Sequence, residues 1–356
     1  MSICCNLVEI KFRIQVAGFG LIDRKGYLGF WVIYTMRMPS RTILFLISAF
    51  ISVLTLVIIL KNIDWQTIQY LSSRMRWQWL GFSFAAYFLN LFLRSIRFKT
   101  LLHSQSISNR SLLVVTSLHN MFNYILPARS GELSYPILAK DRLNVSIVEG
   151  AASLFASRVY DFLTTTLILL IVLPFAWNKL PYWIIKSSLI FSAIVITICA
   201  ITIILISKVD KLGGFSPTHP RIERLYSAFK KVMATLNEIK GEKIHYRIGL
   251  LTVGIWFCLY TNMFFICRAL NYSVDYFQVI LVSLVMIPLS LLPVQGFVDL
   301  GTHELAWVTI MMVFGASYQT ALDIAIGTHF LLMTIILSYG SLSILTVQFL
   351  LRPKQS

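Results

Sequence analysis

Long apolar runs recur along the whole chain, and they constrain its fold more strongly than any other feature of the sequence. They lie at about 42–60, 78–96, 111–127, 147–173, 187–206, 248–267, 278–292, 303–317 and 320–350. A helix needs about 20 predominantly apolar residues to cross a hydrocarbon core about 30 Å thick. Only 13% of the residues are charged, whereas soluble domains carry about 25%. The sequence therefore predicts an all-α polytopic membrane protein.

Three of the runs are short, and each borders a polar stretch that contains proline or glycine: 111–127, 278–292 and 303–317. The distribution of Lys and Arg tests whether they cross, because cytoplasmic loops are enriched in both residues. If the N-terminus is cytoplasmic and every run up to 187–206 crosses, the linker 207–247 lies outside with nine basic residues. Such a topology is unfavourable.

In the alternative topology, two segments enter and leave the membrane on the same side as re-entrant hairpins, 111–146 from the cytoplasm and 278–317 from outside. The cytoplasmic segments then hold 23 of the 31 basic residues, and the external segments hold six. We therefore predict about six full transmembrane helices plus two re-entrant broken-helix hairpins, with both termini cytoplasmic. Broken segments in corresponding positions of two halves are typical of inverted-repeat transporters, although no residue-level repeat is recognisable.

One transmembrane domain accounts for most of the chain. The predicted division is an N-terminal cytoplasmic segment at 1–40, a single transmembrane domain at 41–350 with a cytoplasmic linker at 207–247, and a cytoplasmic tail at 351–356. The N-terminal segment is assigned no function, and Met36 and Met38 are alternative start residues. In the linker, apolar residues recur every three to four positions from Ile222 to Ile239. This pattern fits a helix on the membrane surface or one packed against the protein's own cytoplasmic end.

The net charge of +16 does not indicate nucleic-acid binding in such a chain. A basic excess in cytoplasmic loops is the positive-inside signal of a membrane protein that faces anionic lipid. We therefore expect the plasma (inner) membrane as its location. The sequence shows no nucleotide-binding glycine loop, and its five cysteines and six histidines show no metal-ligand spacing. No catalytic residue, metal or cofactor is predicted.

Polar residues gather in four places, each with a structural and a functional interpretation. The first place holds Arg94 and Arg97, at the cytoplasmic end of the second run. They are three residues apart and therefore share a helix face. They either snorkel to the interface or form a paired guanidinium clamp for phosphate.

The second place, 123–140, brings helix breakers and charges between apolar runs: Pro127, Arg129, Gly131 and Glu132. Asn120 and Asn123 add amide donors one turn earlier. Arg129 and Glu132 are three residues apart, so they could form an ion pair. Backbone amides freed by the helix breakers can face a polar ligand only where protein or water surrounds them. The stretch is either a hairpin tip within the membrane or a plain cytoplasmic turn.

The third place is the pair Arg158 and Asp161, inside the run 147–173. Arg158 lies about 16 Å along this span from Ile147, near the bilayer midplane. An intramembrane arginine costs at least about 2.5–3.5 kcal/mol unless it is compensated, and Asp161 lies on the same helix face. The two residues form a structural ion pair or mark a substrate pathway.

The fourth place is the stretch 293–304, which contains the helix breakers Pro293, Gly296 and Gly301 and the polar residues Asp299, His303 and Glu304. Glu304 begins a new apolar run, so we expect it at a helix N-terminus, where the helix dipole stabilises an anion. His303 titrates near neutrality and could carry a coupling proton. The alternative is an external loop.

Taken in order, these four elements resemble the family of the lysylphosphatidylglycerol synthase transmembrane region, also called the flippase-like domain. The family pattern has an Arg pair that ends an early helix, an Asn followed by P-x-R-x-G-E, an R-x-x-D in the next helix, and a late Pro- and Gly-rich turn that closes with Glu. The matching residues, within about 40–350, are Arg94, Arg97, Asn123, Pro127, Arg129, Gly131, Glu132, Arg158, Asp161, Pro293, Gly296, Gly301 and Glu304.

Two departures from the family pattern are visible. The late turn normally reads close to G-G-x-G-x-x-E, and Val298 and Asp299 occupy the first two glycine positions here. An acidic residue commonly precedes the Arg of R-x-x-D, and Ser157 stands in its place. Arg158 thus has one nearby counter-charge fewer, and we expect it to be freer to meet an anionic substrate.

The resemblance implies an integral membrane transporter or flippase for an anionic lipid or lipid-linked cell-envelope intermediate. The large soluble aminoacyltransferase domain of the synthases is absent from these 356 residues, so we expect lipid translocation and not lipid aminoacylation. The headgroup would lie in a polar cavity between the hairpins. The expected substrate-binding residues are Arg94, Arg97, Asn120, Asn123, Arg129, Glu132, Arg158, Asp161, His303 and Glu304, and the hairpins would be shaped by Pro127, Gly131, Pro293, Gly296 and Gly301.

Two alternative functions remain open from the sequence. The first is a membrane-embedded transferase that acts on a polyprenyl-phosphate-linked sugar, with Glu304 or Asp64 as its acid or base. The second is an accessory subunit of a cell-envelope synthase that transports nothing. The expected partners are therefore a lipid substrate, the membrane, a second copy of the chain or envelope-synthesis enzymes, and no nucleic acid.

Overall fold

The fold was obtained as a computed structural model, in which five main stretches of the chain are described. These are residues 75–102, 107–126, 130–207, 242–291 and 297–350, with a few single residues between them. All of them belong to the unit Leu44–Ser356. The predicted first span at 42–60 and the segment 1–40 lie outside the described residues.

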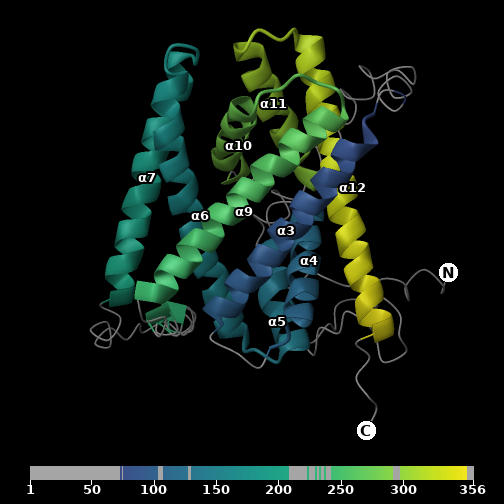
Figure 1. The fold of residues 1–356 in the computed structure, drawn as a ribbon. Helices are drawn as coiled ribbons and strands as arrows, with labels where there is room; N and C mark the ends of the chain where they lie inside the picture. Colours follow the sequence, from purple (N-terminus) through teal and green to yellow (C-terminus); the bar gives the residue numbers. More distant parts are fainter. Residues whose placement is uncertain are drawn as a thin grey trace, which may run out of the picture. The chain divides into compact units, whose positions relative to one another are not determined.

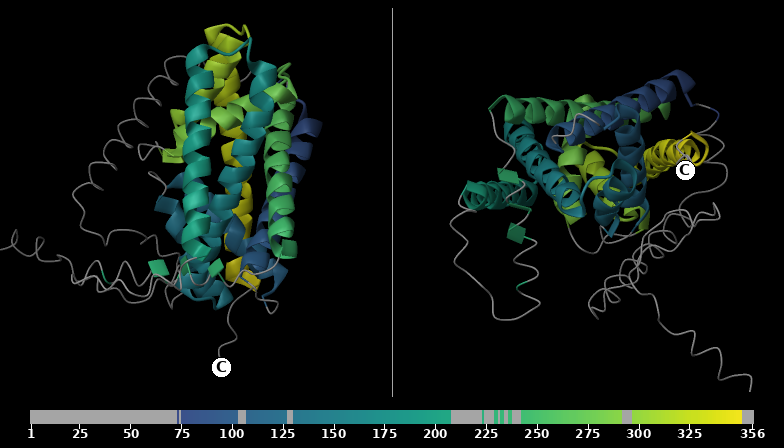
Figure 2. Two further views of the ribbon diagram at one scale, coloured as in Figure 1. Left: turned by 90° about the vertical axis from the view of Figure 1, so that its left-hand side faces the viewer. Right: turned by 90° about the horizontal axis from the view of Figure 1, so that it is seen from below.

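Among the described residues, five helices are long and apolar enough, by length and composition, to cross a membrane. They are α3 (Trp77–Leu101), α6 (Ile147–Ala176), α7 (Tyr182–Ser207), α9 (Glu242–Ala269) and α12 (Tyr318–Leu350). Each contains one of the runs predicted to cross, and the described part of the chain contains no strand. The all-α membrane class is therefore confirmed. In Figures 1 and 2, α6, α7 and α12 run in nearly the same direction, and α3 and α9 cross them obliquely.

The three short apolar runs form the short helices α4 (Asn109–Ile125), α10 (Tyr276–Leu291) and α11 (Thr302–Val313). The polar stretches beside them contain the 3-10 turn η1 (Ser130–Leu133), the short helix α5 (Ser134–Leu143) and the 3-10 turn η3 (Phe297–Asp299). At about 1.5 Å per residue, neither α5 nor α11 can cross a core about 30 Å thick. One order of elements thus occurs twice: α3, α4, η1, α5, α6 and then α9, α10, η3, α11, α12.

In the antiparallel pair of α3 and α9, the same kind of hydrogen bond forms twice, once from each helix to the other. The Asn90 side-chain amide of α3 donates to the backbone oxygen of Ile255 at 2.7 Å. The Asn262 side-chain amide of α9 donates to the backbone oxygen of Ser83 at 2.9 Å. The two asparagines are separated by the same number of positions as their two acceptors, and both are almost fully buried. The contacts of these two helices therefore follow a local two-fold symmetry.

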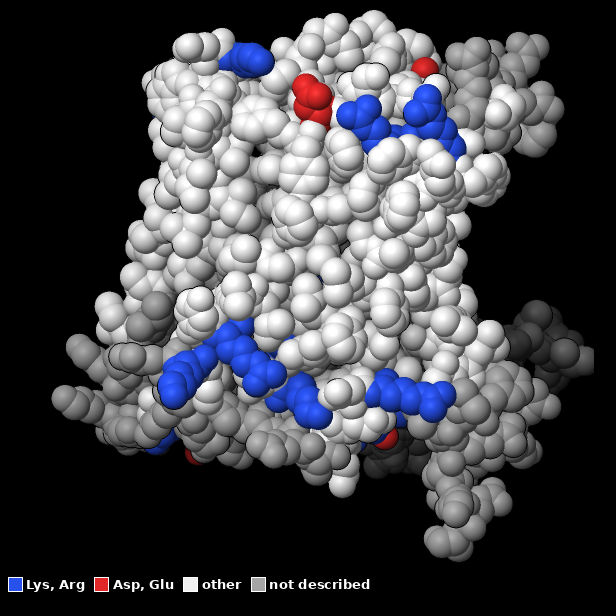
Figure 3. All heavy atoms as spheres, viewed as in Figure 1, with Lys and Arg blue, Asp and Glu red and all other residues white. Residues whose placement is uncertain are grey.

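Charged side chains mark two levels on the surface. On the face shown in Figure 3, Lys and Arg lie in bands near the upper and lower ends, and the wide zone between them is almost free of charge. Large apolar side chains are exposed along the helices in between, including Leu167, Ile171 and Phe175, which are 59%, 65% and 76% exposed. Exposed apolar surface of this kind is what lipid tails cover.

Local sequence signals explain where α5 and α6 meet. Asn144 adopts the left-handed conformation that ends α5 (φ 58°), a role that Asn tolerates well. Ser146 and Glu149 form a reciprocal capping box that starts α6. Gly150 brings α6 against Pro136 of α5, because an added Cβ there would stand 3.0 Å from the Pro136 Cα.

Gly131 fixes the tip of the first hairpin against α4. A Cβ added at Gly131 would overlap the backbone of Phe122 and Asn123. Only glycine allows η1 to approach the C-terminal end of α4 so closely. This packing places the neighbouring Glu132 beside α6.

The predicted amphipathic helix in the linker falls mostly outside the described residues. Among the few residues described there, Met233 and Leu236 are helical and buried.

Candidate functional site

Arg97 of α3 and Asp161 of α6 form a buried ion pair between two helices. Nη1 of Arg97 donates to Oδ1 of Asp161 at 2.6 Å, and Nη2 donates to Oδ2 at 3.2 Å. The Thr252 hydroxyl of α9 accepts a further bond from Nη1 at 3.1 Å. Arg97 is 1% exposed and Asp161 is 4% exposed. The bidentate pair is of the strong kind, and together with Thr252 it engages Nη1 and Nη2 of Arg97. The Nε–H of Arg97 is buried and has no hydrogen-bond partner among the described residues.

Arg158 of α6 lies between two carboxylates. Its Nη2 donates to Oε1 of Glu132 at 2.6 Å, and its Nε donates to Oε2 at 3.3 Å. Its Nη1 also contacts Oδ2 of Asp161 at 3.4 Å, as their spacing predicted. Arg158 is therefore already paired with two carboxylates, and its contact with an anionic substrate stays a prediction. The side chains of Arg158 and Glu132 remain 26% and 21% exposed, so this pair is within reach of a ligand.

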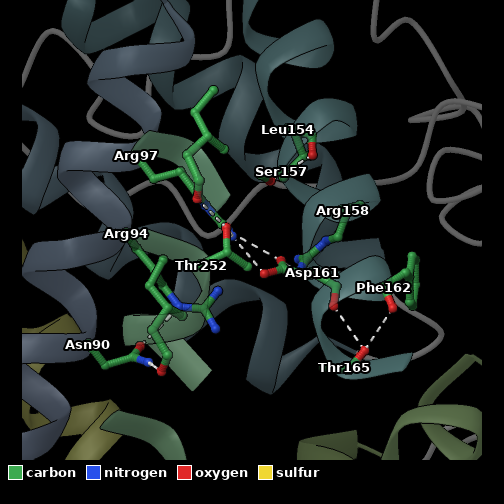
Figure 4. A network of polar contacts seen from close by, with 12 residues as sticks. Asn90, Arg94, Arg97, Leu154, Ser157, Arg158, Asp161, Phe162, Thr165 and Thr252 are labelled. Carbon is green, nitrogen blue, oxygen red and sulfur yellow. Dashed lines mark hydrogen bonds and ion pairs between the residues drawn. The ribbon is translucent and has the colours of Figure 1, made fainter. Parts of the chain in front are cut away.

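Arg94 of α3 differs from its two neighbours. Its Nε donates to Oδ1 of Asn90 at 2.9 Å, and the bond from Asn90 to Ile255 fixes that amide in turn. Among the described residues, no acceptor lies within hydrogen-bond distance of its two terminal nitrogens. Figure 4 shows its guanidinium extending from α3 toward the side of Asp161 with no contact drawn to the terminal nitrogens. Arg94 thus presents two open cationic donors beside a neutralised network.

An apolar cavity of about 330 Å³ opens beside the Arg158–Glu132 pair. Its lining comes from η1, α5 and α6: Glu132, Leu133, Pro136, Ala151, Leu154, Phe155, Arg158 and Phe162. Apolar walls with a small number of placed polar groups are typical of ligand pockets. Leu133 and Phe155 are 55% and 39% exposed, so the cavity opens at the apolar surface.

The two predicted amides of α4 lie in different surroundings. Asn120 donates to the Tyr87 hydroxyl of α3 at 3.1 Å. Oδ1 of Asn123 is buried, and no partner for it lies among the described residues. His119, one residue before Asn120, faces the Ser134 hydroxyl of α5 at 2.9 Å. These contacts join α4 to the helices on both of its sides.

Glu304 lies in the first turn of α11, at the helix N-terminus as predicted, and its side chain pairs with a histidine. Oε1 of Glu304 lies 2.5 Å from Nδ1 of His329 in α12. Oε2 accepts the backbone N–H of Gly301 at 2.7 Å, which closes the first turn of α11. Nε2 of His329 faces the backbone oxygen of Val298 at 2.7 Å. His303 faces the Thr328 hydroxyl at 3.1 Å, with its ring 4.6 Å from that of His329.

The backbone of the late turn is left-handed at three positions. Val298, Asp299 and Gly301 have φ angles of 58°, 56° and 91°. A positive φ is strained for a side-chain-bearing residue and most of all for a β-branched one. The first two positions are those at which the resembling family pattern has glycine, and the conformation gives the physical reason for that preference.

The tips of the two hairpins meet. The end of α4 contacts η3, and the ring of Tyr124 stands edge-on to His329 at 6.1 Å between centroids. The Tyr124 hydroxyl is buried and has no hydrogen-bond partner among the described residues. The first polar network and the late cluster are therefore joined through α4.

Four predicted residues, Pro127, Arg129, Pro293 and Gly296, lie outside the described residues. The described part of the chain contains no cluster of three or more His, Cys, Asp or Glu that could hold a metal. Sequence reasoning missed Asn90, Thr252 and His329. A polar residue within an apolar run was the available signal for all three, and it is strongest for the ionisable His329.

Comparison with known proteins gives one result. The family model described as the lysylphosphatidylglycerol synthase TM region matches residues 45–340, which include all four polar places. The resemblance read from the sequence is thereby confirmed. No curated protein and no solved structure matches.

Proposed function

We propose that this chain, which belongs to the family of the lysylphosphatidylglycerol synthase TM region, moves an anionic lipid or a lipid-linked cell-envelope intermediate across the plasma membrane. The family match and the apolar helices support the assignment of this chain as a lipid-related membrane protein. The finer assignment rests on the site between α3, α5, α6 and α9.

The open guanidinium of Arg94 carries this proposal. The described charges of the network are three arginines and two carboxylates: Arg94, Arg97, Arg158, Glu132 and Asp161. They leave one positive charge, and a lipid phosphodiester carries one negative charge. An uncompensated charge within the membrane is costly. Binding of an anionic headgroup would neutralise this charge and so stabilise the site.

The apolar cavity supplies room for the rest of a lipid. It ends at the partly exposed Arg158–Glu132 pair, and Asp161 connects this pair to Arg97. A headgroup contacting Arg94 or Arg158 would leave an acyl chain free to lie against Leu154, Phe155 and Phe162. Arg97 is a positioning residue in this scheme, because its donors hold Asp161 and not the ligand.

The repeated order of helices supports a transport mechanism. Both halves contain a long helix, a broken short pair and a second long helix, and the α3–α9 contacts follow a two-fold pattern. If the two short pairs are re-entrant hairpins that enter from opposite faces, the halves form an inverted repeat. In such folds the site lies between the repeats, and access alternates by movement of one repeat against the other.

The test is a leaflet-selective quenching assay in liposomes that contain fluorescent anionic lipid. We expect Arg94→Gln to slow lipid movement roughly 10- to 100-fold, because hydrogen bonds to charged groups contribute about 1.5–3 kcal/mol. Arg110→Gln is the matched control, since Arg110 is exposed at the start of α4. Wild-type protein that moves no anionic lipid would defeat the proposal.

The same vesicles distinguish the alternatives. A new covalent lipid product in their mass spectrum would instead assign a transferase. Glu304 is a weak candidate for its acid or base, because this carboxylate is 7% exposed and both of its oxygens are engaged. Lipid movement that appears only when an envelope-synthesis enzyme is added would favour the accessory role.

A further inference from the structure

The contact between Glu304 and His329 contains a proton. Nε2 of His329 faces the Val298 carbonyl oxygen, which can only accept, so Nε2 carries a hydrogen. Nδ1 lies 2.5 Å from Oε1 of Glu304. An unprotonated nitrogen and an ionised oxygen would repel each other at this distance. A proton therefore lies between Nδ1 and Oε1, whichever atom holds it more tightly.

His303 is the neutral neighbour of this pair. The Thr328 hydroxyl donates to the backbone oxygen of Ala325 at 3.0 Å. It must therefore accept from Nε2 of His303, which places the ring hydrogen of His303 on that nitrogen. A second positive charge on the His303 ring, whose centroid lies 4.6 Å from that of His329, would be unfavourable beside a protonated His329. The bound proton belongs to the Glu304–His329 pair.

The elements around His329 hold few other titratable groups. Asp299 of η3 adds a negative charge on the turn side, and Tyr124 of α4 stands edge-on to the ring. The remaining groups, on α11, are Glu304 and His303. His329 is 5% exposed, so solvent does not replace the contacts that it makes.

This proton also holds a strained segment. The carbonyl that His329 binds belongs to Val298, the first of two consecutive left-handed residues with side chains. Such conformations persist only where the surroundings enforce them. His329 is attached to the turn at two points, Val298 and Glu304, and so ties both ends of it to α12.

We propose that Glu304 and His329 form a proton-binding site in which the bound proton latches the turn 298–304 onto α12, and that loss of this proton releases the turn. Release of the turn also frees the ring of Tyr124 in α4, which stands edge-on to His329. The change at the turn is thereby transmitted to the tip of the first hairpin. The latch is independent of the proposed lipid movement. Its use as the energy-coupling site of that movement rests on the proposed function.

The test measures the accessibility of the turn as a function of pH, without lipid substrate. Leu300→Cys is introduced into a background with Cys4 and Cys5 replaced by Ser, and its labelling by a maleimide is timed. Gln319→Cys, exposed on the first turn of α12, corrects for the pH dependence of the thiol itself. We expect the ratio of the two labelling rates to rise roughly tenfold as pH increases through loss of the proton.

Variants identify the groups responsible. His329→Asn in the Leu300→Cys protein should label rapidly at every pH, with a flat ratio. Val298→Gly keeps the carbonyl and removes the strain, so it should move the rise in labelling to higher pH. This variant is also the safeguard against misfolding, because glycine suits its φ of 58°. A rate ratio that stays constant across the pH range in the unsubstituted background would overturn the latch.

A direct measurement of the proton completes the design. Ring-nitrogen shifts of isotope-labelled histidine report protonation, and the His329 signal is identified by its loss in His329→Asn. The carboxyl-carbon shift of Glu304 reports the other half of the pair. At acidic pH we expect one proton between Nδ1 of His329 and Oε1 of Glu304, seen either as a second ring hydrogen on His329 or as a protonated Glu304 carboxyl. A neutral His329 ring beside an ionised Glu304 carboxylate at acidic pH would contradict the proposal even if lipid movement were confirmed.

Discussion

Asp161 determines the electrostatics of the first network more than any arginine does. It receives hydrogen bonds from Arg97 and Arg158, and it is nearly fully buried. Buried ion pairs contribute little net stability when complete, but loss of one partner leaves an uncompensated charge. Asp161 therefore pairs with two of the three arginines of this network, Arg97 and Arg158, and leaves Arg94 as the open one.

We expect Asp161→Asn to destabilise the protein by about 3–5 kcal/mol, because Arg97 would keep a buried, unpaired charge. Thermal unfolding in detergent measures the change. Asp141→Asn, at an exposed carboxylate near the end of α5, is the control and should leave the unfolding temperature almost unchanged. Equal stability of the two variants would show that the Arg97–Asp161 pair is not buried in the protein.

The short helices depend on close backbone contact more than on their own length. Gly131 touches the backbone of α4, and Gly150 touches α5. An α5 of 10 residues is too short to be stable alone, so tertiary packing holds it. The first hairpin tip is thus an element whose shape is set by glycine at the contact point.

Gly131→Ala should disrupt this tip, because the new Cβ would overlap the backbone of Phe122 and Asn123, which cannot give way as a flexible side chain can. Gly249→Ala in α9 is a matched control with no atom within 4 Å of its added Cβ. The control should be neutral or stabilising by about 0.5–1 kcal/mol, since Ala is favoured over Gly in a helix. Protease sensitivity and thermal unfolding of both variants provide the comparison, and similar behaviour of the two would refute the close contact.

At the scale of the whole molecule, the arrangement of short and long helices is the physical argument for re-entrant hairpins. Five of the described helices are long enough to cross, and the short pairs α4–α5 and α10–α11 each include a helix that is not. On the face shown in Figure 3, charge lies in two bands with a nearly uncharged zone between them. Backbone within such a zone must be surrounded by protein or water, which the contact of α4 with η3 provides.

Cysteine labelling from each side of the membrane tests this topology. If both pairs are re-entrant, Arg110→Cys and Asp141→Cys should react only from the cytoplasm, because they flank the first hairpin. Asn178→Cys and Asp275→Cys should react only from outside. Reaction of Arg110→Cys and Asp141→Cys from opposite sides would show that the first short pair is not a re-entrant hairpin. External labelling of residues 216–240 would show that the linker is not cytoplasmic and would overturn the predicted topology.

Composition and hydropathy were sufficient to predict the membrane class, the five described helices that are long enough to cross, and the three short helices α4, α10 and α11. These properties are local, because an apolar run of a given length has the same meaning wherever it packs. The ordered motifs also predicted the family, which the match over residues 45–340 confirms. The pairing of Arg158 with Asp161, and the position of Glu304 in the first turn of α11, followed from helix periodicity and end effects alone.

The partners of the charged residues were decided by tertiary structure. Arg97 meets Asp161 across 64 positions and Arg158 meets Glu132 across 26, while the expected partner of Glu132, Arg129, lies outside the described residues. His329 gained its role only because α12 faces the turn 298–304. Which face of a helix meets which neighbour depends on how the helices rotate and cross when they pack, and an apolar pattern that is nearly uniform around a membrane helix does not encode that rotation.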